Sequence, residues 1–352
     1  MILYMNLFGS NSKIGVDIGT AAIKVVELDK KGNRFSLRNY GLFELKSLKT
    51  AGNLDRSILQ LPDDEIIWGI KEVLKKSKIK PGMAVASIPS FSTFATVIEM
   101  PYLSQAELAK AIPFEARKYV PIPLEEVVLD WSIVGIKEQE ARPVVEVFLA
   151  AVPRQSTMRY QTLMTGAGLN LKALELENSA LIRSVLGNDL SPTAVVNIGG
   201  RSTSIIVVNK GYERLSHNYE VGGFEITKSI ARSLNVSIEK AEELKKSLGL
   251  KQVDENTINE AMISLIDMMA FETKKTITAY ETSKNQKIDR VLLVGGMANM
   301  PNFITYFRQK LGQDVFIGNP FARTVYPSSL TPVIQELAST FAVATGLAMR
   351  EL

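Results

Sequence analysis

Short apolar runs alternate with amphipathic stretches along the chain, and this alternation predicts an α/β fold. Residues 15–28 contain two runs rich in Val and Ile that a polar turn separates, which predicts a hairpin of two buried strands. Further strands are expected over residues 34–43 and 83–89. Between them, the apolar residues of 66–74 recur at helical spacing and predict an amphipathic helix.

The hairpin pattern occurs a second time. Residues 195–208 align without a gap with residues 15–28, so that Asn197 corresponds to Asp17, 180 positions earlier. Each copy opens about half of the chain. Two copies in register predict a duplicated fold that binds a ligand between its halves.

The region between the two copies, residues 91–176, is expected to be an inserted α+β unit. Pro113 lies inside its first helical pattern and predicts a kink or an early helix end. The strand patterns cover residues 95–100, 127–134 and 144–152, and the helical patterns cover residues 105–119 and 155–165.

The second half predicts helices over residues 224–234, 237–248 and 257–283, followed by a short strand over 290–294. We interpret the apolar stripe of the longest helix as core. The expected organisation is an N-terminal tail (1–12), a first lobe (13–90 and 177–192), the inserted unit (91–176) and a second lobe (193–352) with a helical subdomain at about 223–285.

The apolar start of the chain leaves several interpretations open. Met5 is a possible true first residue, and residues 1–8 fit either a disordered tail or a short foot that touches a membrane or a partner. They lack the basic region and cleavage site of a signal peptide. No apolar run approaches the roughly 20 residues that span a bilayer.

Composition removes several classes of function. The 352 residues carry 41 basic and 37 acidic side chains, and the resulting net charge of +4 is too small to indicate nucleic-acid binding. The basic run 71–80 is interpreted as the solvated face of a helix. The absence of cysteine excludes disulfides, thiolate metal sites and a cysteine nucleophile, and it suits a reducing cytoplasm. The single histidine, His217, is interpreted as a surface or structural residue.

The first polar turn has the composition of a phosphate site. A phosphate needs backbone N–H groups, a nearby cation and little side-chain bulk. Gly19 permits close approach, Thr20 offers a hydroxyl, and Lys24 supplies the cation. Asp17 would repel phosphate and is suited instead to hold Mg²⁺ through water.

Three further glycine pairs have similar potential. Gly199 and Gly200 form the turn of the second hairpin and are expected to face the first one. The pair at 222–223 precedes a predicted helix, and the pair at 295–296 follows an apolar strand. All three are therefore places where backbone can approach a ligand closely.

These motifs, in this order, resemble those of the actin, DnaK-type chaperone and FtsA superfamily. Glu177 to Ala180 is similar to its first connecting segment, and residues 341–347 resemble its second connecting helix. The resemblance implies an actin-like (ribonuclease H-like) duplicated fold, with two lobes around a nucleotide cleft and an FtsA-type inserted α+β subdomain.

The same resemblance implies ATP and Mg²⁺ as cofactors. It places Asp17 at Mg²⁺ through water, and Gly19, Thr20 and Lys24 at the phosphates. Asn197, Gly199 and Gly200 would face the phosphates from the second hairpin, with Gly222 and Gly223 at the next turn. Glu242 and Lys245 would lie near the ribose and base, and Gly295, Gly296 and Asn299 under the adenosine. Glu177 is the candidate for positioning water, and a helix N-terminal carboxylate is the alternative.

Two positions depart from the hydrolysing relatives. An acidic residue is usual in these relatives where Asn197 stands, and DnaK-type chaperones have a second one at Ser204. A neutral side chain keeps hydrogen bonds but loses the charge that helps to hold Mg²⁺ and water. We therefore expect nucleotide binding with weak or no ATPase activity.

Within the superfamily, residues 107–131 and 150–153 resemble the PilM family of type IV pilus assembly proteins. The resemblance implies a cytoplasmic scaffold of the pilus assembly platform, peripheral to the inner membrane through its partners. Those partners are the N-terminal cytoplasmic tail of PilN, held in a groove beside the inserted subdomain, and other platform proteins. Candidates for the groove lining are Phe91, Tyr102, Tyr119 and Val120, with core packing as the alternative for each.

Two alternatives remain open. A small-molecule kinase of the sugar-kinase branch shares the first hairpin, but the inserted unit offers apolar and aromatic surface rather than a sugar-sized polar cluster. FtsA itself and the cytoplasmic part of GspL are the second alternative. FtsA carries a C-terminal amphipathic helix and GspL a transmembrane helix, and we expect neither after Leu352.

Overall fold

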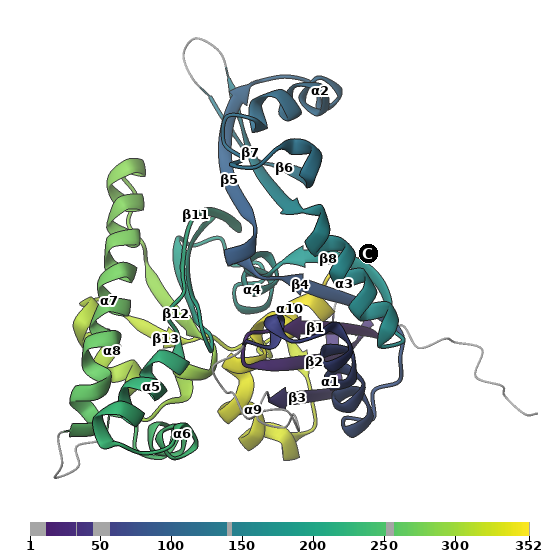
Figure 1. Ribbon diagram of the computed structural model, residues 1–352. Coiled ribbons are helices and arrows are strands. Elements are labelled where there is room, and N and C mark those ends of the chain that lie inside the picture. The colour runs from purple at the N-terminus through teal and green to yellow at the C-terminus, as the bar shows by residue number, and fades with distance from the viewer. Residues whose placement is uncertain (1–11, 33, 45–56, 139–142, 251–256, 352) are drawn as a thin grey trace, which may run out of the picture.

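The computed structural model describes residues 12–32, 34–44, 57–138, 143–250 and 257–351. The apolar start at residues 1–8 lies outside the described residues. Figure 1 shows two lobes side by side, with a third and smaller unit projecting above the first lobe.

The first lobe is built on a six-stranded sheet with the order β14-β3-β2-β1-β4-β8. Its strands are β1 (Lys13–Ile18), β2 (Ala22–Lys31), β3 (Arg34–Glu44), β4 (Met83–Ile88), β8 (Asn170–Leu176) and β14 (Thr324–Val325). Helices α1 (Asp63–Lys76) and α3 (Arg154–Gly166) pack on it. The apolar face of α1 is buried and the lysines of the basic run 71–80 are exposed, as the pattern predicted.

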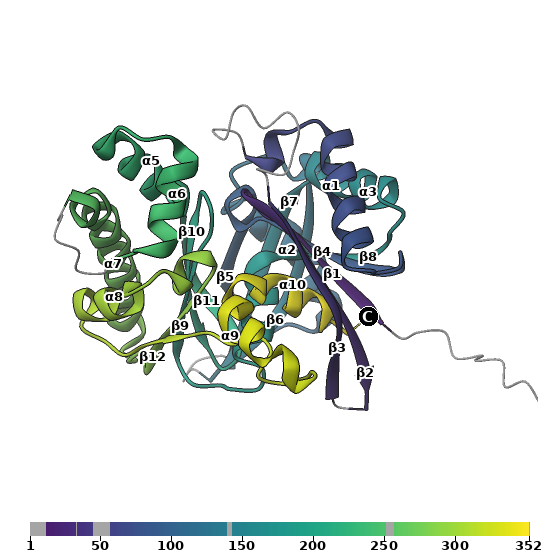
Figure 2. The ribbon, with the colours of Figure 1, turned by 90° about the horizontal axis from the view of Figure 1, so that it is seen from below.

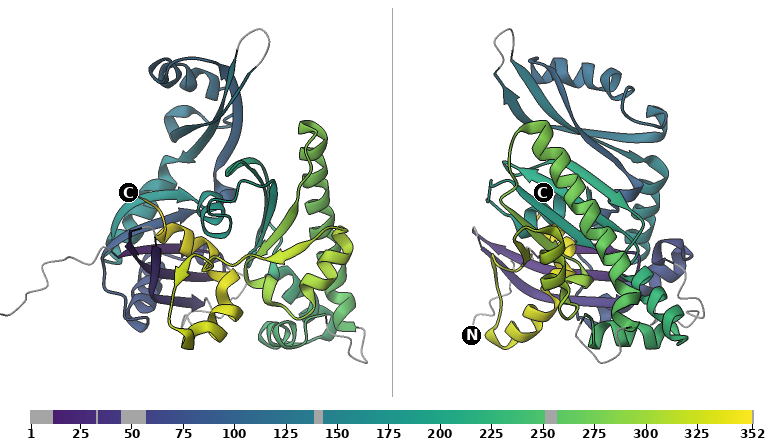
Figure 3. Two further views of the ribbon diagram at one scale, coloured as in Figure 1. Left: turned by 180° about the vertical axis from the view of Figure 1, so that it is seen from behind. Right: turned by 90° about the vertical axis from the view of Figure 1, so that its left-hand side faces the viewer.

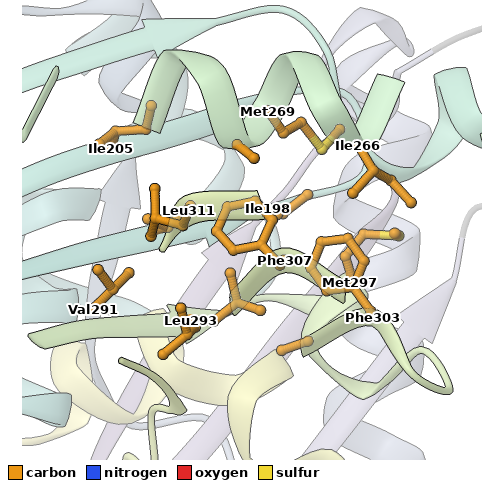
Figure 4. Close-up of a cluster of buried hydrophobic side chains, with 14 of the residues drawn as sticks. Ile198, Ile205, Ile266, Met269, Val291, Leu293, Met297, Phe303, Phe307 and Leu311 are labelled. Atoms are coloured by element: carbon orange, nitrogen blue, oxygen red, sulfur yellow. The ribbon is translucent and has the colours of Figure 1, made fainter. Parts of the chain in front are cut away.

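The second lobe is built on a five-stranded sheet with the order β11-β10-β9-β12-β13. Its strands are β9 (Thr193–Ile198), β10 (Thr203–Asn209), β11 (Tyr212–Tyr219), β12 (Arg290–Val294) and β13 (Val315–Ile317), and its helices are α5 (Gly223–Leu234), α6 (Ile238–Ser247), α7 (Thr257–Lys284) and α8 (Phe303–Leu311). Figure 4 shows the apolar core in which Met269 of α7 and Phe307 of α8 lie over the sheet. The predicted stripe of α7 is therefore core.

Two helices lie between the sheets, α4 (Glu177–Val185) and α10 (Ala342–Ala348), as Figure 1 shows, and Figure 2 shows α10 there from below. Their backbones nearly touch, because a Cβ on Gly346 would lie 1.9 Å from the carbonyl oxygen of Ala180. Only glycine fits at such a contact. The remaining helix is α9 (Thr331–Leu337), and the 3₁₀ turns are η2 (Ile58–Gln60), η3 (Ser90–Ser92), η4 (Leu124–Glu126), η5 (Gly296–Asn299), η6 (Ser328–Leu330) and η7 (Ala338–Phe341).

The inserted unit is a three-stranded antiparallel sheet with the order β5-β7-β6, covered on one face by α2 (Gln105–Ala116). Its strands are β5 (Phe94–Pro101), β6 (Val127–Lys137) and β7 (Val144–Pro153). Helix α2 begins at a capping box formed by Ser104 and Glu107 and continues through Pro113. Pro113 is exposed, so water can reach the carbonyl that the ring leaves unpaired.

The sheets correct two of the expected boundaries. Strand β8 pairs in parallel with β4, and α3 packs on α1, so the inserted unit ends at Pro153 and not at residue 176. The chain also returns to the first lobe at its end, because β14 pairs with β3 and Phe341 is buried against β2 and β3. The apolar segment at 341–348 is buried on all sides between the lobes, which explains why its sequence does not indicate a lobe.

The lone histidine, expected to be a surface or structural residue, lies at the surface of the second lobe. His217 lies on β11, partly exposed, with its Nε2 atom 3.4 Å from the Glu272 carboxylate. The views from behind and from the side in Figure 3 show the inserted unit projecting beyond the two lobes, with the long helix α7 at the outer side of the second lobe.

Candidate functional site

The tips of the two predicted hairpins meet at the centre of the molecule. In the first hairpin Asp17 is opposite Lys24, and in the second Asn197 is opposite Ser204. A Cβ on Gly200 would lie 2.6 Å from Cβ of Ala21. The two turns are therefore in direct contact, and glycine at position 200 is what permits it.

Asp17 lies at the end of β1, and its side chain is fixed from both neighbouring strands. Lys24 Nζ on β2 donates to Asp17 Oδ2 at 2.8 Å, and Ser87 Oγ on β4 donates to Asp17 Oδ1 at 3.2 Å. Asp17 is 4% exposed. The hydrogen bonds from these partners offset the hydration that so buried a carboxylate loses.

Glu177 lies between Asp17 and Asn197. It is the first residue of α4, and its Oε1 accepts a hydrogen bond of 2.9 Å from Asn197 Nδ2. Burial and the nearby Asp17 charge raise the pKa of Glu177 to about 7, although Lys24, the backbone N–H of Ser90 and Asn197 act in the opposite direction. The structure thus brings Asp17, Glu177 and Asn197 together, as expected for one site.

The hairpin tips have the chemistry to hold a phosphate chain. Within the described residues, the backbone N–H groups of Thr20, Ala21 and Gly200 donate no hydrogen bond. Lys24 Nζ would lie 3.3 Å from a Cβ at position 19, so Gly19 leaves room for the ammonium over the turn. Free amides beside a cation fit an anion.

A divalent cation would need oxygen ligands from the nucleotide as well. In the described part of the chain, no three acidic or histidine side chains converge as a metal site. Asp17 is a single carboxylate, which fits Mg²⁺ held with phosphate oxygens and water rather than in a protein cage.

The second glycine pair is bonded to the second hairpin. The N–H of Gly223 donates to Gly199 O at 3.0 Å, and that of Phe224 donates to Gly200 O at 2.7 Å. Gly222 and Gly223 therefore fix the tip of the second hairpin at the start of α5.

Lys245 supports this turn from beneath. Its Nζ lies 2.9 Å from Gly223 O, 2.8 Å from Thr227 Oγ1 and 2.6 Å from a Glu242 oxygen, so all three donors are used. Burial lowers the pKa of Lys245, and the Glu242 charge opposes that shift. Lys245 is thus placed as a support of the backbone, whereas Glu242 keeps 35% of its side chain exposed.

The third glycine pair forms the turn that follows β12. Gly295 has φ +90°, and a Cβ there would lie 2.2 Å from Ile198 O, so only glycine fits. Gly296 is exposed, with no protein atom within 4 Å of a Cβ. Ser339 Oγ lies 3.1 Å from Asn299 Oδ1 and 3.3 Å from Gly295 O, which ties this turn to the 3₁₀ turn before α10.

The sequence reasoning missed three serines. Ser87 and Ser90 contact Asp17, Glu177 and Asn178, and Ser339 holds the turn at 295–299. A polar residue in an otherwise buried strand was the only signal for Ser87. Ser90 and Ser339 carried none, because they lie in irregular segments outside any motif.

The four groove candidates do not lie together. Val120 is buried in the core of the inserted unit, at 7% exposure, so its core-packing alternative is correct. Phe91, Tyr102 and Tyr119 are exposed, at 41%, 58% and 43%. The whole of β5 separates Phe91 from Tyr102, which is about 25 Å at about 3.3 Å per residue.

Two lobes on duplicated hairpins, with carboxylates at the meeting point of the tips, define an actin-like fold. The family model described as type IV pilus assembly protein PilM matches residues 15–352, and the chain belongs to this family. Among the described residues, no helix is both long enough and apolar enough to cross a membrane.

Solved structures share the fold. A chain of the PilM-PilN type IV pilus biogenesis complex is 22% identical with a TM-score of 0.82, covering 97% of this chain and 99% of that one. The ethanolamine utilization protein EutJ from Carboxydothermus hydrogenoformans is 20% identical (TM-score 0.59, covering 98% and 91%). MreB5 of Spiroplasma citri bound to AMPPNP is 12% identical (TM-score 0.54, covering 96% and 95%).

Curated relatives include cell division proteins. FtsA of Enterococcus faecalis is 23% identical over 87% of this chain and 77% of its own length. FtsA of Bacillus subtilis is 22% identical over 87% and 78%. The expected similarity of the chain to FtsA is confirmed.

Proposed function

We propose that this chain is a cytoplasmic ATP-binding scaffold of the type IV pilus assembly platform at the inner membrane. The observation that carries the proposal is the contact of the two hairpin tips around Asp17, Lys24 and Glu177. That arrangement offers an anion site, a cation and a buried carboxylate in one place. The family membership and the nucleotide named for the MreB5 structure support it.

The residues at the tips would share the work of binding. Mg²⁺, when bound, neutralises part of the triphosphate charge. Asp17 would hold it through water, Lys24 would move from Asp17 toward phosphate oxygens, and the free amides of Thr20 and Gly200 would accept the phosphate chain. Gly296 leaves open space for the nucleoside.

Hydrolysis is expected to be slow. Asn197 donates to Glu177, so an amide stands where hydrolysing relatives have a second carboxylate. The amide keeps Glu177 in place but adds no charge to hold a metal ion or to polarise water. The chain is therefore proposed to keep its nucleotide and to use it structurally.

The partner is proposed to be the N-terminal cytoplasmic peptide of PilN. The solved relative in complex with PilN supports this choice. The exposed aromatic side chains Phe91, Tyr102 and Tyr119 are candidate contacts along the inserted unit. Extended peptides gain main-chain pairing and apolar pockets at such surfaces. Through PilN and other platform proteins the chain would lie at the inner membrane, without binding nucleic acid.

Two experiments test the proposal. The purified protein is denatured and any released nucleotide is identified, and calorimetry then measures Mg·ATP binding to the nucleotide-free protein. PilN peptide binding is measured separately for Tyr119→Asp, with the exposed Lys240→Asp as a control. The proposal expects peptide binding to be lost in the first variant only, with ATP still bound. A protein that binds no adenine nucleotide contradicts it.

A further inference from the structure

The inserted unit is attached to the two lobes in different ways. It is covalently part of the first lobe, since β4 leads through η3 into β5, and β7 leads into α3 (Figure 1). Its ion pairs, in contrast, connect it to the second lobe. Among the side chains that the structure describes, every ion pair that leaves the inserted unit ends in the second lobe.

The stronger of these links joins Arg214 on β11 to Glu146 on β7. The Nη1 atom of Arg214 donates to Glu146 Oε2 at 2.7 Å, and the two side chains are only 9% and 12% exposed. The Nη2 atom of Arg214 donates to Val134 O on β6 at 3.2 Å. One guanidinium thus holds two strands of the inserted sheet.

The pair belongs to a larger network of ion pairs. Glu146 also accepts from Lys137 at 2.9 Å, and Lys137 pairs with Glu99. Lys284, near the end of α7, lies 3.9 Å from Glu99 and adds a second link to the second lobe. Although burial of Glu146 disfavours its charge, Lys137 and Arg214 hold its pKa below the usual range. Glu146 is therefore ionised at neutral pH.

The inserted unit meets the second lobe at another place as well, at the base of β5, and a cavity lies there. A cavity of about 120 Å³ separates the base of β5 from β11, and it is lined by Ser90, Thr93, Phe94, Ala95, Leu176, Asn178, Ser216 and Asn218. Asn218 Oδ1 has no hydrogen-bond partner there. This empty volume leaves room for the base of the inserted unit to shift relative to β11. The buried ion pair at the other end resists separation.

We propose that Arg214 is a positioning residue that makes the inserted unit follow the second lobe when the lobes close on a nucleotide. The unit then moves against the first lobe, its covalent attachment, and the surface between them changes with the nucleotide. This inference rests on the proposed nucleotide binding. Through the Arg214–Glu146 ion pair, partner binding at the surface between the inserted unit and the first lobe would depend on whether a nucleotide is bound between the lobes.

The chain has no cysteine, so introduced cysteines can be spin-labelled without side reactions. The exposed positions Lys110 on α2, Lys274 on α7 and Lys75 on α1 report on the inserted unit, the second lobe and the first lobe. Each pair of positions is measured with and without Mg·AMPPNP. We expect the distance from 110 to 274 to stay constant, while the distances from 75 to both others change.

The perturbing variant is Arg214→Met with Glu146→Met in the full chain. Replacing both partners avoids an uncompensated buried charge, so the fold should survive, and thermal melting checks this. In this variant the distance from 110 to 274 should broaden even without nucleotide, and it should change when nucleotide binds. The matched control exchanges the exposed pair Lys240 and Glu243 within α6 and should leave every distance as in the parent.

Three results would overturn the inference: an inserted unit that keeps its distance to position 75, lobes that do not move on nucleotide binding, or an unchanged 110–274 distribution in the Met variant. Failure of the proposed function looks different. Calorimetry would then show no AMPPNP binding to the parent protein, and the nucleotide-free broadening in the Met variant would still decide the role of Arg214.

Discussion

Lys24 and Ser204 occupy the same position in the two hairpins, each opposite the residue that ends the first strand. Lys24 pairs with Asp17, and Ser204 lies opposite Asn197. The first hairpin therefore carries a buried ion pair at 2.8 Å, while the second is neutral at both positions. The two hairpins share a backbone pattern but differ in charge, so together they contribute one cation, Lys24, and one carboxylate, Asp17, to the place where their tips meet.

Lys24 should supply much of the phosphate affinity. We expect Lys24→Met to weaken ATP binding by about tenfold to a hundredfold, since a hydrogen bond to a charged group contributes about 1.5–3 kcal/mol. Adenosine, which has no phosphate, should bind the variant and the parent alike. Calorimetry with both ligands measures this, with Lys75→Met on the exposed side of α1 as the control. Equal ATP affinity in parent and variant would contradict the role.

A substitution at Gly296 should lower ATP affinity without lowering the stability of the fold. No protein atom lies within 4 Å of a Cβ at this position, so Gly296→Val should keep the melting temperature of the parent. The added side chain would occupy the space proposed for the nucleoside, and we expect ATP binding to fall by at least about tenfold, or about 1.4 kcal/mol. Gly82→Val, at another roomy glycine far from the cleft, is the control. If Gly296→Val bound ATP as tightly as the parent, the nucleoside could not lie beside Gly296 as proposed.

Much of the fold could be predicted because its signals are local. The twin hairpins, the stripe of α7 and the strands of the inserted unit follow from periodicity within short windows. The end of the inserted unit at Pro153 and the return of the chain to the first lobe at β14 could not be predicted in the same way. Whether β8 or α10 belongs to one lobe or another is decided by pairing with strands far along the chain, and a local pattern holds no such information.

The site shows the same division. Asp17, Lys24 and Asn197 could be predicted as site residues from the sequence, because the same hairpin pattern recurs 180 positions later. The role of Lys245 could not be predicted from the sequence, because only the structure shows that protein groups accept all three of its N–H donors. Val120 failed for a similar reason: an apolar residue near exposed aromatics reads as groove lining until its burial is known.

Glu213 should make stability depend on pH. It is buried on β11, its partners are the neutral Asn178 and Ser216, and burial raises its pKa. The folded state therefore holds a proton that the unfolded state has already lost, so stability falls as pH rises from below the ordinary glutamate value through the folded pKa. Glu213→Gln removes this titration and keeps an acceptor for Asn178.

We expect the variant to gain stability over the parent as pH rises from about 4 to about 8, with no gain at the acid end. Urea unfolding at several pH values measures the difference. Glu243→Gln, exposed on α6, should show no such trend. A constant difference between Glu213→Gln and the parent across this range would mean that Glu213 has the same pKa in the folded and unfolded chain.

Asn197 should set the rate of hydrolysis. Its amide donates to Glu177 Oε1 at 2.9 Å, so Asn197→Asp replaces a donor with a third carboxylate beside Asp17 and Glu177. Like charges should destabilise the nucleotide-free variant, and Mg²⁺ should restore it. With Mg·ATP we expect turnover to rise about tenfold, which corresponds to about 1.4 kcal/mol of barrier. Phosphate release measures this. Asn197→Ser removes the donor without adding charge and should stay slow, and adding Glu177→Gln to Asn197→Asp should cancel the gain. Equal rates for Asn197→Asp and Asn197→Ser would show that the missing charge is not what keeps the nucleotide intact.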